Sequence, residues 1–306
     1  MNTNRAEYLR HDGVMTSEIS DILIDAPKGI FVDATYGYGS HFKYFSDIHN
    51  HLNFVGFDRD EEAVINSDKT HEVIHKNFSQ IDSYFKLHNI NSISGIFYDF
   101  GVSSHQLGSS YRGFSYQNNS NLDMRMDKSQ KLSAKDIVNN YEINDLISIF
   151  FNFGEEQHAK KIATSIIENR PINTTDELVS VIKLSIPRQN PKYTKSSIRR
   201  IFQSIRIEVN NELNEIGTSL DNIKNFIKAG GIMIFLTYHS IEDKIIKKFI
   251  DNEVKGCLCN PKYAICTCTN FAQFKLGEYK KRKPSTSEIQ SNPRSKSAVL
   301  RYMVKI

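Results

Sequence analysis

The sequence predicts an α/β fold with a mostly parallel, Rossmann-like sheet and an inserted all-helical subdomain. Apolar runs alternate with helical patterns early in the chain, which is typical of parallel strands joined by crossover helices. Three of these runs end in acidic residues, namely Asp33, Asp58 and Asp99. From about residue 133 to about 200 the patterns are helical only, and the alternation of strands and helices resumes afterwards.

The first part of the chain, 1–104, is predicted to form the first half of the sheet. Its elements follow from the switch between the two-residue and the 3.6-residue apolar period. After a strand at 30–33 we expect a helix at 39–45, a strand at 52–57, a helix at 61–67, a strand at 72–75, a helix at 78–88 and a strand at 92–98. A polar loop then runs to about Lys131, and loops of this length are usually functional.

The rest of the chain is predicted to hold the insertion and the second half of the sheet. Residues 105–200 comprise the long loop and the helical subdomain, and residues 201–306 return to the sheet. Apolar residues from Val209 to Ile227 recur at spacings of four and three, which predicts one long helix that ends before Gly230.

Two more strands complete the expected sheet. The strand at 232–236 follows the long helix directly and carries His239 toward the edge where the three acids lie. The last strand, at 298–304, is expected at an edge of the sheet.

A glycine turn behind Asp33 points to a nucleoside site. Gly37 and Gly39 open a helix, and Asp58 stands about 20 residues further on, where an acid usually accepts hydrogen bonds from ribose hydroxyls. A dinucleotide site would need a third glycine, but that position holds Phe42. Carboxylates favour a cation over a pyrophosphate, so S-adenosylmethionine is the expected cofactor. The alternatives are a dinucleotide-dependent oxidoreductase, and a surface turn beside solvated strand ends.

Seven short motifs give the chain a resemblance to a known family. They are Asp33–Thr35 with the glycine turn and His41, Asp99–Ser104 with Gln106 and Leu107, Arg112–Ser115, Leu122–Asp127, Phe202–Asn210, His239–Asp243 and Asn292–Ala298. Together and in this order they resemble the bacterial small-subunit ribosomal RNA cytosine-N4 methyltransferases, the RsmH or MraW family, over nearly the whole chain. The resemblance implies a class I S-adenosylmethionine-dependent methyltransferase that modifies the exocyclic N4 amine of a cytidine in the decoding region of 16S rRNA.

The resemblance also assigns the residues that bind the methyl donor. They are Gly39, Ser40, His41, Asp58, Phe78, Asp99 and Gln106. The chain departs from the family pattern at several positions, among them Ser40, where the family usually has glycine, and Tyr238, where it usually has phenylalanine. We interpret these departures as drift, because the acids are retained.

Physical roles follow for the residues of this pattern. Asp58 is expected to accept hydrogen bonds from both ribose hydroxyls, Phe78 to pack on adenine, and Gln106 to read the edge of that base. The backbone of 39–41 begins a helix, which favours the methionine carboxylate. Asp99 is expected to be catalytic: its carboxylate holds the donor or accepts an N–H from the target amine, and the sequence leaves both open.

The target base must leave its stack to reach the donor, so groups that hold RNA are expected nearby. The candidate substrate-binding residues are Arg112, Arg125, Arg206 and His239. Each could stack on a base or hold a phosphate. A salt bridge or a satisfied core position is the alternative for each of them.

The charge distribution favours a nucleic-acid partner. From Lys275 onward, basic residues greatly outnumber Glu278 and Glu288, although the net charge of the whole chain is only +4. A basic strip of this kind is expected for an RNA partner, here 16S rRNA, either naked or within the small ribosomal subunit; a solvated tail is the alternative. No signal peptide or membrane span is evident, so a cytoplasmic protein is expected. The sequence leaves the oligomeric state open.

Four cysteines form two close pairs, Cys257 with Cys259 and Cys266 with Cys268. In a cytosolic protein such pairs suggest a metal sooner than disulfides, and four thiolates complete a tetrahedral zinc site. Each pair has one intervening residue, however, rather than the two to four of typical zinc ligands. The spacing therefore favours plain thiols, a zinc site stays open as the alternative, and no metal is expected where methyl transfer occurs.

Overall fold

The computed structural model describes residues 13–109, 111–186, 191–257, 259, 265, 268 and 271–306. The chain divides into two units: unit 1 consists of Met1–Gly101 and Leu213–Ile306, and unit 2 of Val102–Glu212. The expected boundary between residues 200 and 201 falls inside a helix that unit 2 contains as a whole, so the insertion extends further along the chain than 105–200.

A seven-stranded sheet organises unit 1. Its strands, in spatial order, are β3 (Val73–His75), β2 (Leu52–Asp58), β1 (Gly29–Asp33), β4 (Ile93–Asp99), β5 (Ile227–Thr237), β7 (Val299–Lys305) and β6 (Phe274–Leu276). The first five are parallel, and β7 runs antiparallel to both β5 and β6. This mostly parallel order confirms the class I methyltransferase fold. The last strand is not at an edge as expected, because the three-residue β6 pairs along its outer side.

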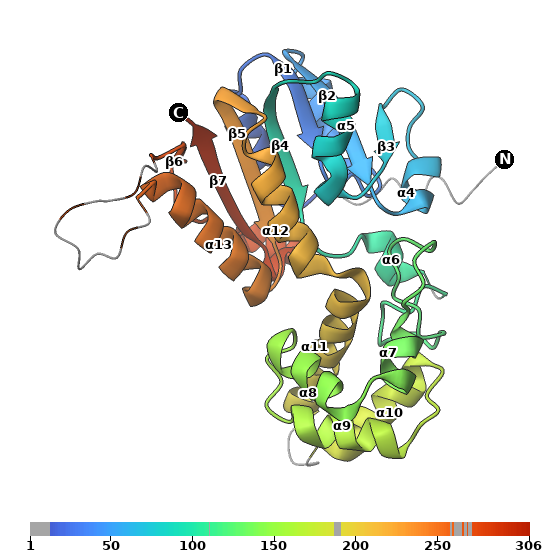
Figure 1. Ribbon diagram of the computed structural model, residues 1–306. Helices are drawn as coiled ribbons and strands as arrows, with labels where there is room; N and C mark the ends of the chain where they lie inside the picture. The colour runs from blue at the N-terminus through green and yellow to red at the C-terminus, as the bar shows by residue number, and fades with distance from the viewer. Residues whose placement is uncertain are drawn as a thin grey trace. The chain divides into compact units, whose positions relative to one another are not determined.

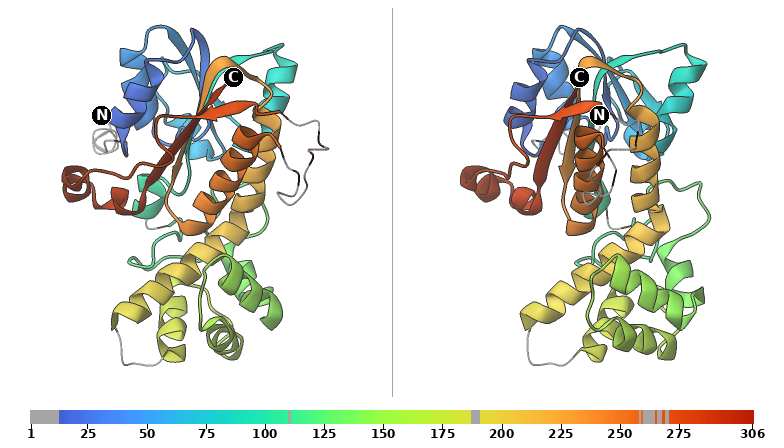
Figure 2. Two further views of the ribbon diagram at one scale, coloured as in Figure 1. Left: turned by 90° about the vertical axis from the view of Figure 1, so that its left-hand side faces the viewer. Right: turned by 60° about the vertical axis from the view of Figure 1, so that its left-hand side comes forward.

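Helices cover both faces of this sheet (Figures 1 and 2). The helical elements of unit 1 are α2 (Thr16–Leu23), α3 (Ser40–Ile48), α4 (Glu61–Ile65), η1 (Phe78–Gln80), α5 (Ile81–Leu87), α12 (Glu212–Ile223), α13 (Ser240–Lys255), α14 (Thr286–Ser291) and η2 (Pro293–Ser297). Apolar residues of α5, α12 and α13 share one buried cluster with the sheet, and residues of α2 and α3 share another. Strands buried on both faces explain the continuous apolar runs of the sequence.

The prediction of a single helix over 209–227 is wrong, because this segment contains the end of α11, all of α12 and the start of β5. Asn211 has a left-handed φ of 50°, which ends one helix and starts the next. After α12, Ile227 already belongs to β5 and pairs with Ile93. The ladder then shifts register, and Gly230, with a φ of 74°, lies inside the strand instead of after a helix.

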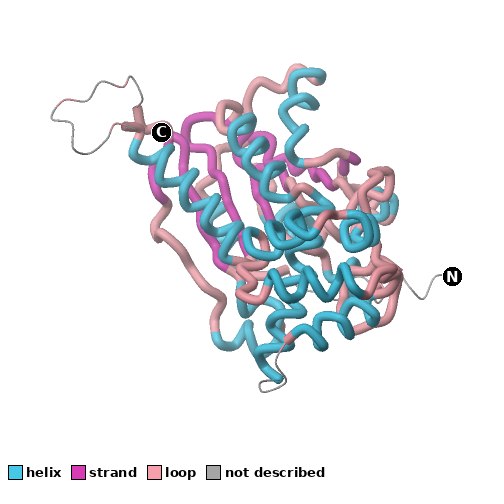
Figure 3. The backbone as a smooth tube through the Cα atoms, turned by 60° about the horizontal axis from the view of Figure 1, so that its bottom comes forward, coloured by secondary structure: helices cyan, strands magenta, loops and turns pink. Residues whose placement is uncertain are grey.

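Unit 2 is built from helices and loops, as Figure 3 shows for its helices in cyan. Its helices are α6 (Ser104–Gly108), α7 (Ala134–Asn140), α8 (Ile143–Asn152), α9 (Ala159–Glu168), α10 (Thr175–Ser185) and α11 (Pro191–Asn210). The helical patterns expected between about 133 and 200 are confirmed, and their apolar residues meet in the core of unit 2: Leu146, Phe150, Ile162, Ile166, Leu178 and Ile182 are fully buried. In the described parts of the chain, no helix is both long and apolar enough to cross a membrane.

Candidate functional site

The three acids stand at the carboxyl ends of neighbouring parallel strands, as predicted. Asp33 ends β1, Asp58 ends β2 and Asp99 ends β4, with β1 between the other two. The chain runs from β1 to β2 and β3 on one side and then crosses back to β4 on the other side of β1. This reversal of strand order makes the edge the switch point where open α/β sheets bind ligands. Burial, the largest cause, raises the pKa of Asp33 to about 8, and the charges of Asp99 and Asp58 contribute to the rise.

The glycine turn between β1 and α3 is tied to Asp58. The N–H of Gly37 donates to Oδ2 of Asp58 over 2.7 Å, and the N–H of Asp60 donates to Oδ1 over 2.8 Å. Burial raises the pKa of Asp58 to about 6, although these two N–H groups oppose the rise. Each carboxylate oxygen keeps a second lone pair for a further donor.

Gly39 shapes the turn where α3 begins. Its φ is 76°, and a Cβ atom there would lie 2.5 Å from the hydroxyl of Tyr36. Glycine therefore suits this backbone position, and the first N–H groups of α3 follow it directly. An anionic group could approach these N–H groups closely.

Asp99 is held by side chains on both of its oxygens. The hydroxyl of Tyr238 donates to Oδ1 over 2.8 Å, and Nδ1 of His41 lies 3.5 Å from Oδ2. Nε2 of His41 lies 2.9 Å from the carbonyl of Val14, which can only accept, so Nε2 carries a proton. Burial raises the pKa of Asp99, against the opposing effects of His41 and the Tyr238 hydroxyl.

Ser40 is the first residue of α3, and the last two unit 1 candidates, Phe78 and His239, are packed against neighbouring elements. The ring of half-buried Phe78 meets Tyr98 and Phe100 edge-on, with centroids 5.9 and 6.0 Å apart. His239 caps α13, where its Nδ1 accepts the N–H of Glu242 over 3.3 Å. Their expected contacts with adenine and RNA stay predictions.

The candidates in unit 2 make local contacts of their own. Gln106 forms a capping box with Ser103 at the start of α6. Arg112 is 1% exposed and donates to the carbonyls of Arg125 and Met126. Arg206 donates two hydrogen bonds, of 2.7 and 2.8 Å, to the carboxylate of Glu212. The structure thus gives these residues positions in the fold of unit 2, and their contacts with donor or RNA stay predictions.

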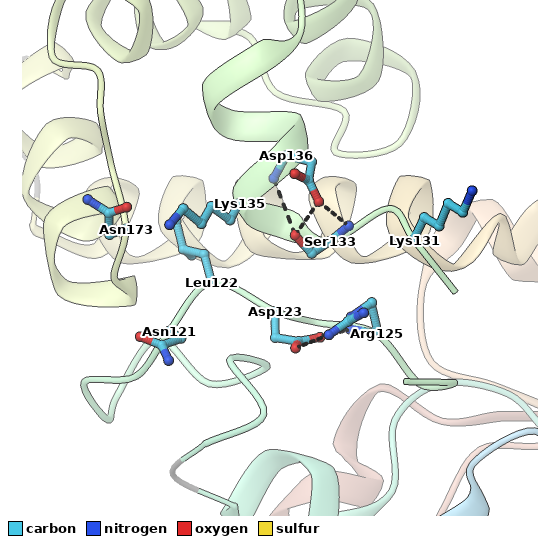
Figure 4. Close-up of a pocket in the computed structure, with 9 residues that line it drawn as sticks. All are labelled: Asn121, Leu122, Asp123, Arg125, Lys131, Ser133, Lys135, Asp136 and Asn173. Atoms are coloured by element: carbon cyan, nitrogen blue, oxygen red, sulfur yellow. Dashed lines mark hydrogen bonds and ion pairs between the residues drawn. The ribbon is translucent and has the colours of Figure 1, made fainter. Parts of the chain in front are cut away.

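A pocket of about 380 Å³ opens in unit 2 (Figure 4). Its lining residues are Asn121, Leu122, Asp123, Arg125, Lys131, Ser133, Lys135, Asp136 and Asn173. Asp123 is paired with the guanidinium of Arg125 by two hydrogen bonds of 2.9 Å. Asp136 accepts the N–H and hydroxyl of Ser133. With the acids occupied in this way, the pocket offers cationic and amide groups to a ligand.

Sequence reasoning named only Arg125 among these lining residues as a candidate for substrate binding. The amides of Asn121 and Asn173 and the ammonium groups of Lys131 and Lys135 belong to the pocket as well. The one available signal was the polar composition of the long loop, which does not tell which of its residues face a common space.

The chain is similar to methyltransferases of known name. A family model described as the MraW methylase family matches residues 8–306. Ribosomal RNA small subunit methyltransferase H of Caldicellulosiruptor bescii is 40% identical over 306 residues, a match that covers 97% of this chain and 99% of that protein. The protein of the same name from Clostridioides difficile is 38% identical over 307 residues, with the same coverage.

Among solved structures, an rRNA methylase from Streptococcus thermophilus is 11% identical, with 94% of this chain and 95% of that chain covered. The TM-score is 0.41, which is too low to support a conclusion. The family match along almost the entire sequence, together with relatives near 40% identity, is decisive. The chain belongs to the MraW methylase family, and S-adenosylmethionine is the cofactor of this methylase.

Proposed function

We propose that the protein transfers the methyl group of S-adenosylmethionine to the exocyclic N4 amine of a cytidine in the decoding region of 16S rRNA, in the cytoplasm. Family membership and relatives named ribosomal RNA small subunit methyltransferase H support the reaction and the kind of RNA. The finer target is the one that the sequence motifs imply. The observation that carries the proposal is the group of acids at the ends of β1, β2 and β4, beside a glycine turn at the switch point of the sheet.

The residues of the site fit the cofactor. When bound, S-adenosylmethionine supplies a methyl group on a positively charged sulfur, and the neighbouring carboxylates of Asp58 and Asp99 favour that charge. Gly39 lets the turn pass close to Tyr36, where a Cβ atom would clash, and the N–H groups at the start of α3 suit the methionine carboxylate. Asp58 accepts the ribose hydroxyls, Phe78 packs on adenine, and Gln106 reads the edge of the base.

The target amine needs precise placement more than a strong base. The lone pair of a cytosine N4 atom is delocalised into the ring, so the enzyme must hold the amine in line with the methyl group. As the bond from N4 to the methyl carbon forms, the bond from that carbon to sulfur breaks and its electron pair stays on sulfur. N4 then loses one proton, in the end to solvent. We assign Asp99 chiefly to the donor, where its charge faces the sulfonium and ammonium groups.

The pocket of unit 2 supports contact with RNA. Lys131 and Lys135 carry two positive charges at its rim, and the neighbouring asparagine amides can donate to phosphate oxygens. Arg125 lies in the same pocket, where Asp123 fixes its guanidinium plane as a surface on which a base could stack. Arg112, Arg206 and His239 stay candidate substrate-binding residues of this proposal. Their local contacts would act by holding the neighbouring segments in place.

The experiment uses small subunits from cells that lack the enzyme. The purified protein is incubated with isotopically labelled S-adenosylmethionine and either these subunits or the naked 16S rRNA, and the modified nucleotide is mapped by mass spectrometry. We expect label on N4 of one cytidine in the decoding region. Asp99→Ala serves as the inactive control. Label on a different base or atom, or tight binding of NAD in place of the donor, would contradict the proposal.

A further inference from the structure

A cluster of thiols lies in the loop between α13 and β6, at the end of unit 1 that the methyl-transfer chemistry does not use. The sulfur atoms of Cys257, Cys259 and Cys268 all lie within 4.8 Å of one another. The Sγ atoms of Cys257 and Cys268 are 3.6 Å apart. Cys266 lies outside the described residues, so the cluster is defined by the other three.

The backbone brings the two ends of this loop together. Gly256 ends α13 with a φ of 66°, and a Cβ atom there would collide with the backbone of Ala272. The N–H of Gln273 donates to the carbonyl of Glu253 over 3.0 Å, which holds the returning chain beside the last turn of α13 (Figure 1). Cys257 directly follows Gly256, so thiols from both ends of the loop meet next to this junction.

The separation of the Cys257 and Cys268 sulfur atoms is close to that of two ligands of one metal ion. With Zn–S bonds of about 2.3 Å, the ligand sulfurs of a tetrahedral site lie about 3.8 Å apart. A disulfide requires about 2.05 Å, so the separation of Cys257 and Cys268 is far too long for that bond.

We infer that Cys257, Cys259 and Cys268 supply three of the four ligands of a structural zinc site. Thiolate sulfurs are soft ligands, and a cluster made of them alone selects zinc over the hard cations magnesium and calcium. Each ligating thiol gives its proton to solvent as its bond to the ion forms. The ion fastens the loop to the end of α13 and fixes where the chain enters β6, the strand from which the basic tail departs.

The test measures bound metal in the full-length, tag-free protein, purified under reducing conditions without chelator. Elemental analysis should find about one zinc ion per chain. Cys257→Ser and Cys268→Ser should each remove most of it. Ile265→Ser is the matched control, because it changes a side chain in the same loop that is 76% exposed and is no metal ligand; it should keep the zinc.

Cobalt supplies a second readout that needs no variant. After removal of zinc, Co²⁺ should produce sulfur-to-cobalt charge-transfer absorption and the intense visible bands of a tetrahedral ion, and zinc should displace it. Absence of both metals from the reduced wild-type protein would overturn the inference. So would zinc content that the two serine variants leave unchanged, or a disulfide joining Cys257 to Cys268 in protein alkylated directly from cells. None of these readouts depends on methyl transfer, so they stand apart from the proposed function.

Discussion

The hydroxyl of Tyr238 donates a 2.8 Å hydrogen bond to Oδ1 of Asp99, which joins the ends of β4 and β5 at the switch point of the sheet. Burial holds the pKa of Tyr238 well above its ordinary range, so this hydroxyl remains a donor. A hydrogen bond to the ionised carboxylate lowers the pKa of Asp99 and thus opposes the effect of burial. Tyr238 is therefore a positioning residue for the acid that is expected to face the donor.

Replacement of Tyr238 by phenylalanine tests this relationship. Removal of the hydroxyl should weaken binding of S-adenosylmethionine by about 0.5–1.5 kcal/mol, the usual range for one hydrogen bond. The acidic limb of the binding profile should also move to higher pH, because the pKa of Asp99 rises further. Titration calorimetry across a pH series measures both effects. Tyr302→Phe, whose hydroxyl accepts the N–H of Glu278, is the control and should change neither.

Removal of the Asp99 carboxylate should have a larger effect. Asp99→Ala is expected to weaken donor binding by about 1.5–3 kcal/mol, the scale of a hydrogen bond to a charged group. Asp47→Ala is the matched control, because Asp47 is an exposed acid that pairs with Lys43 on the surface of α3. Unchanged donor affinity in Asp99→Ala would refute the assignment of Asp99 to the donor.

The pKa of Asp58 predicts how donor binding depends on pH. Its carboxylate accepts two ribose hydroxyls only when ionised, and burial raises its pKa to about 6. Donor affinity should therefore increase as the pH rises through about 6 and then level off. Asp58→Asn should bind weakly at every pH, without this increase. Equilibrium dialysis with labelled donor measures the profile, and an increase of equal size in Asp58→Asn would contradict the prediction.

Asp33 predicts the pH dependence of stability without any ligand. Its pKa rises from 3.8 to about 8 on folding, so the folded state retains a proton that the unfolded state loses between these values. The stabilisation that this proton provides is complete below pH 3.8 and is lost as the pH rises toward 8. Urea denaturation at about pH 5 and about pH 8 should show a smaller loss for Asp33→Asn than for the wild-type protein. Equal losses would show that Asp33 does not carry the effect.

The sequence predicted the acid edge well, because it rests on local patterns. Asp33, Asp58 and Asp99 each end an apolar run, and parallel strands necessarily bring such ends to one edge. The break at Asn211 was missed, since the apolar spacing continues across it and a left-handed φ leaves no trace in that spacing. The contacts of Arg112 with backbone carbonyls were equally invisible, because residues distant from it in sequence create them only after folding.

The pocket of unit 2 yields the prediction on RNA. If Lys131 and Lys135 bind phosphates, the double variant Lys131→Ala/Lys135→Ala should bind RNA more weakly. The slope of log K against the logarithm of the salt concentration should become shallower by about 0.7–0.9 for each phosphate that is no longer neutralised. Donor affinity should not change. The matched control replaces Lys160 and Lys161 by alanine. These two exposed lysines belong to α9 in the same unit and do not line the pocket, so the control removes the same amount of charge at another place. RNA binding measured by fluorescence anisotropy at several salt concentrations separates the cases. An equal reduction in both double variants would mean that general charge, and not this pocket, attracts the RNA.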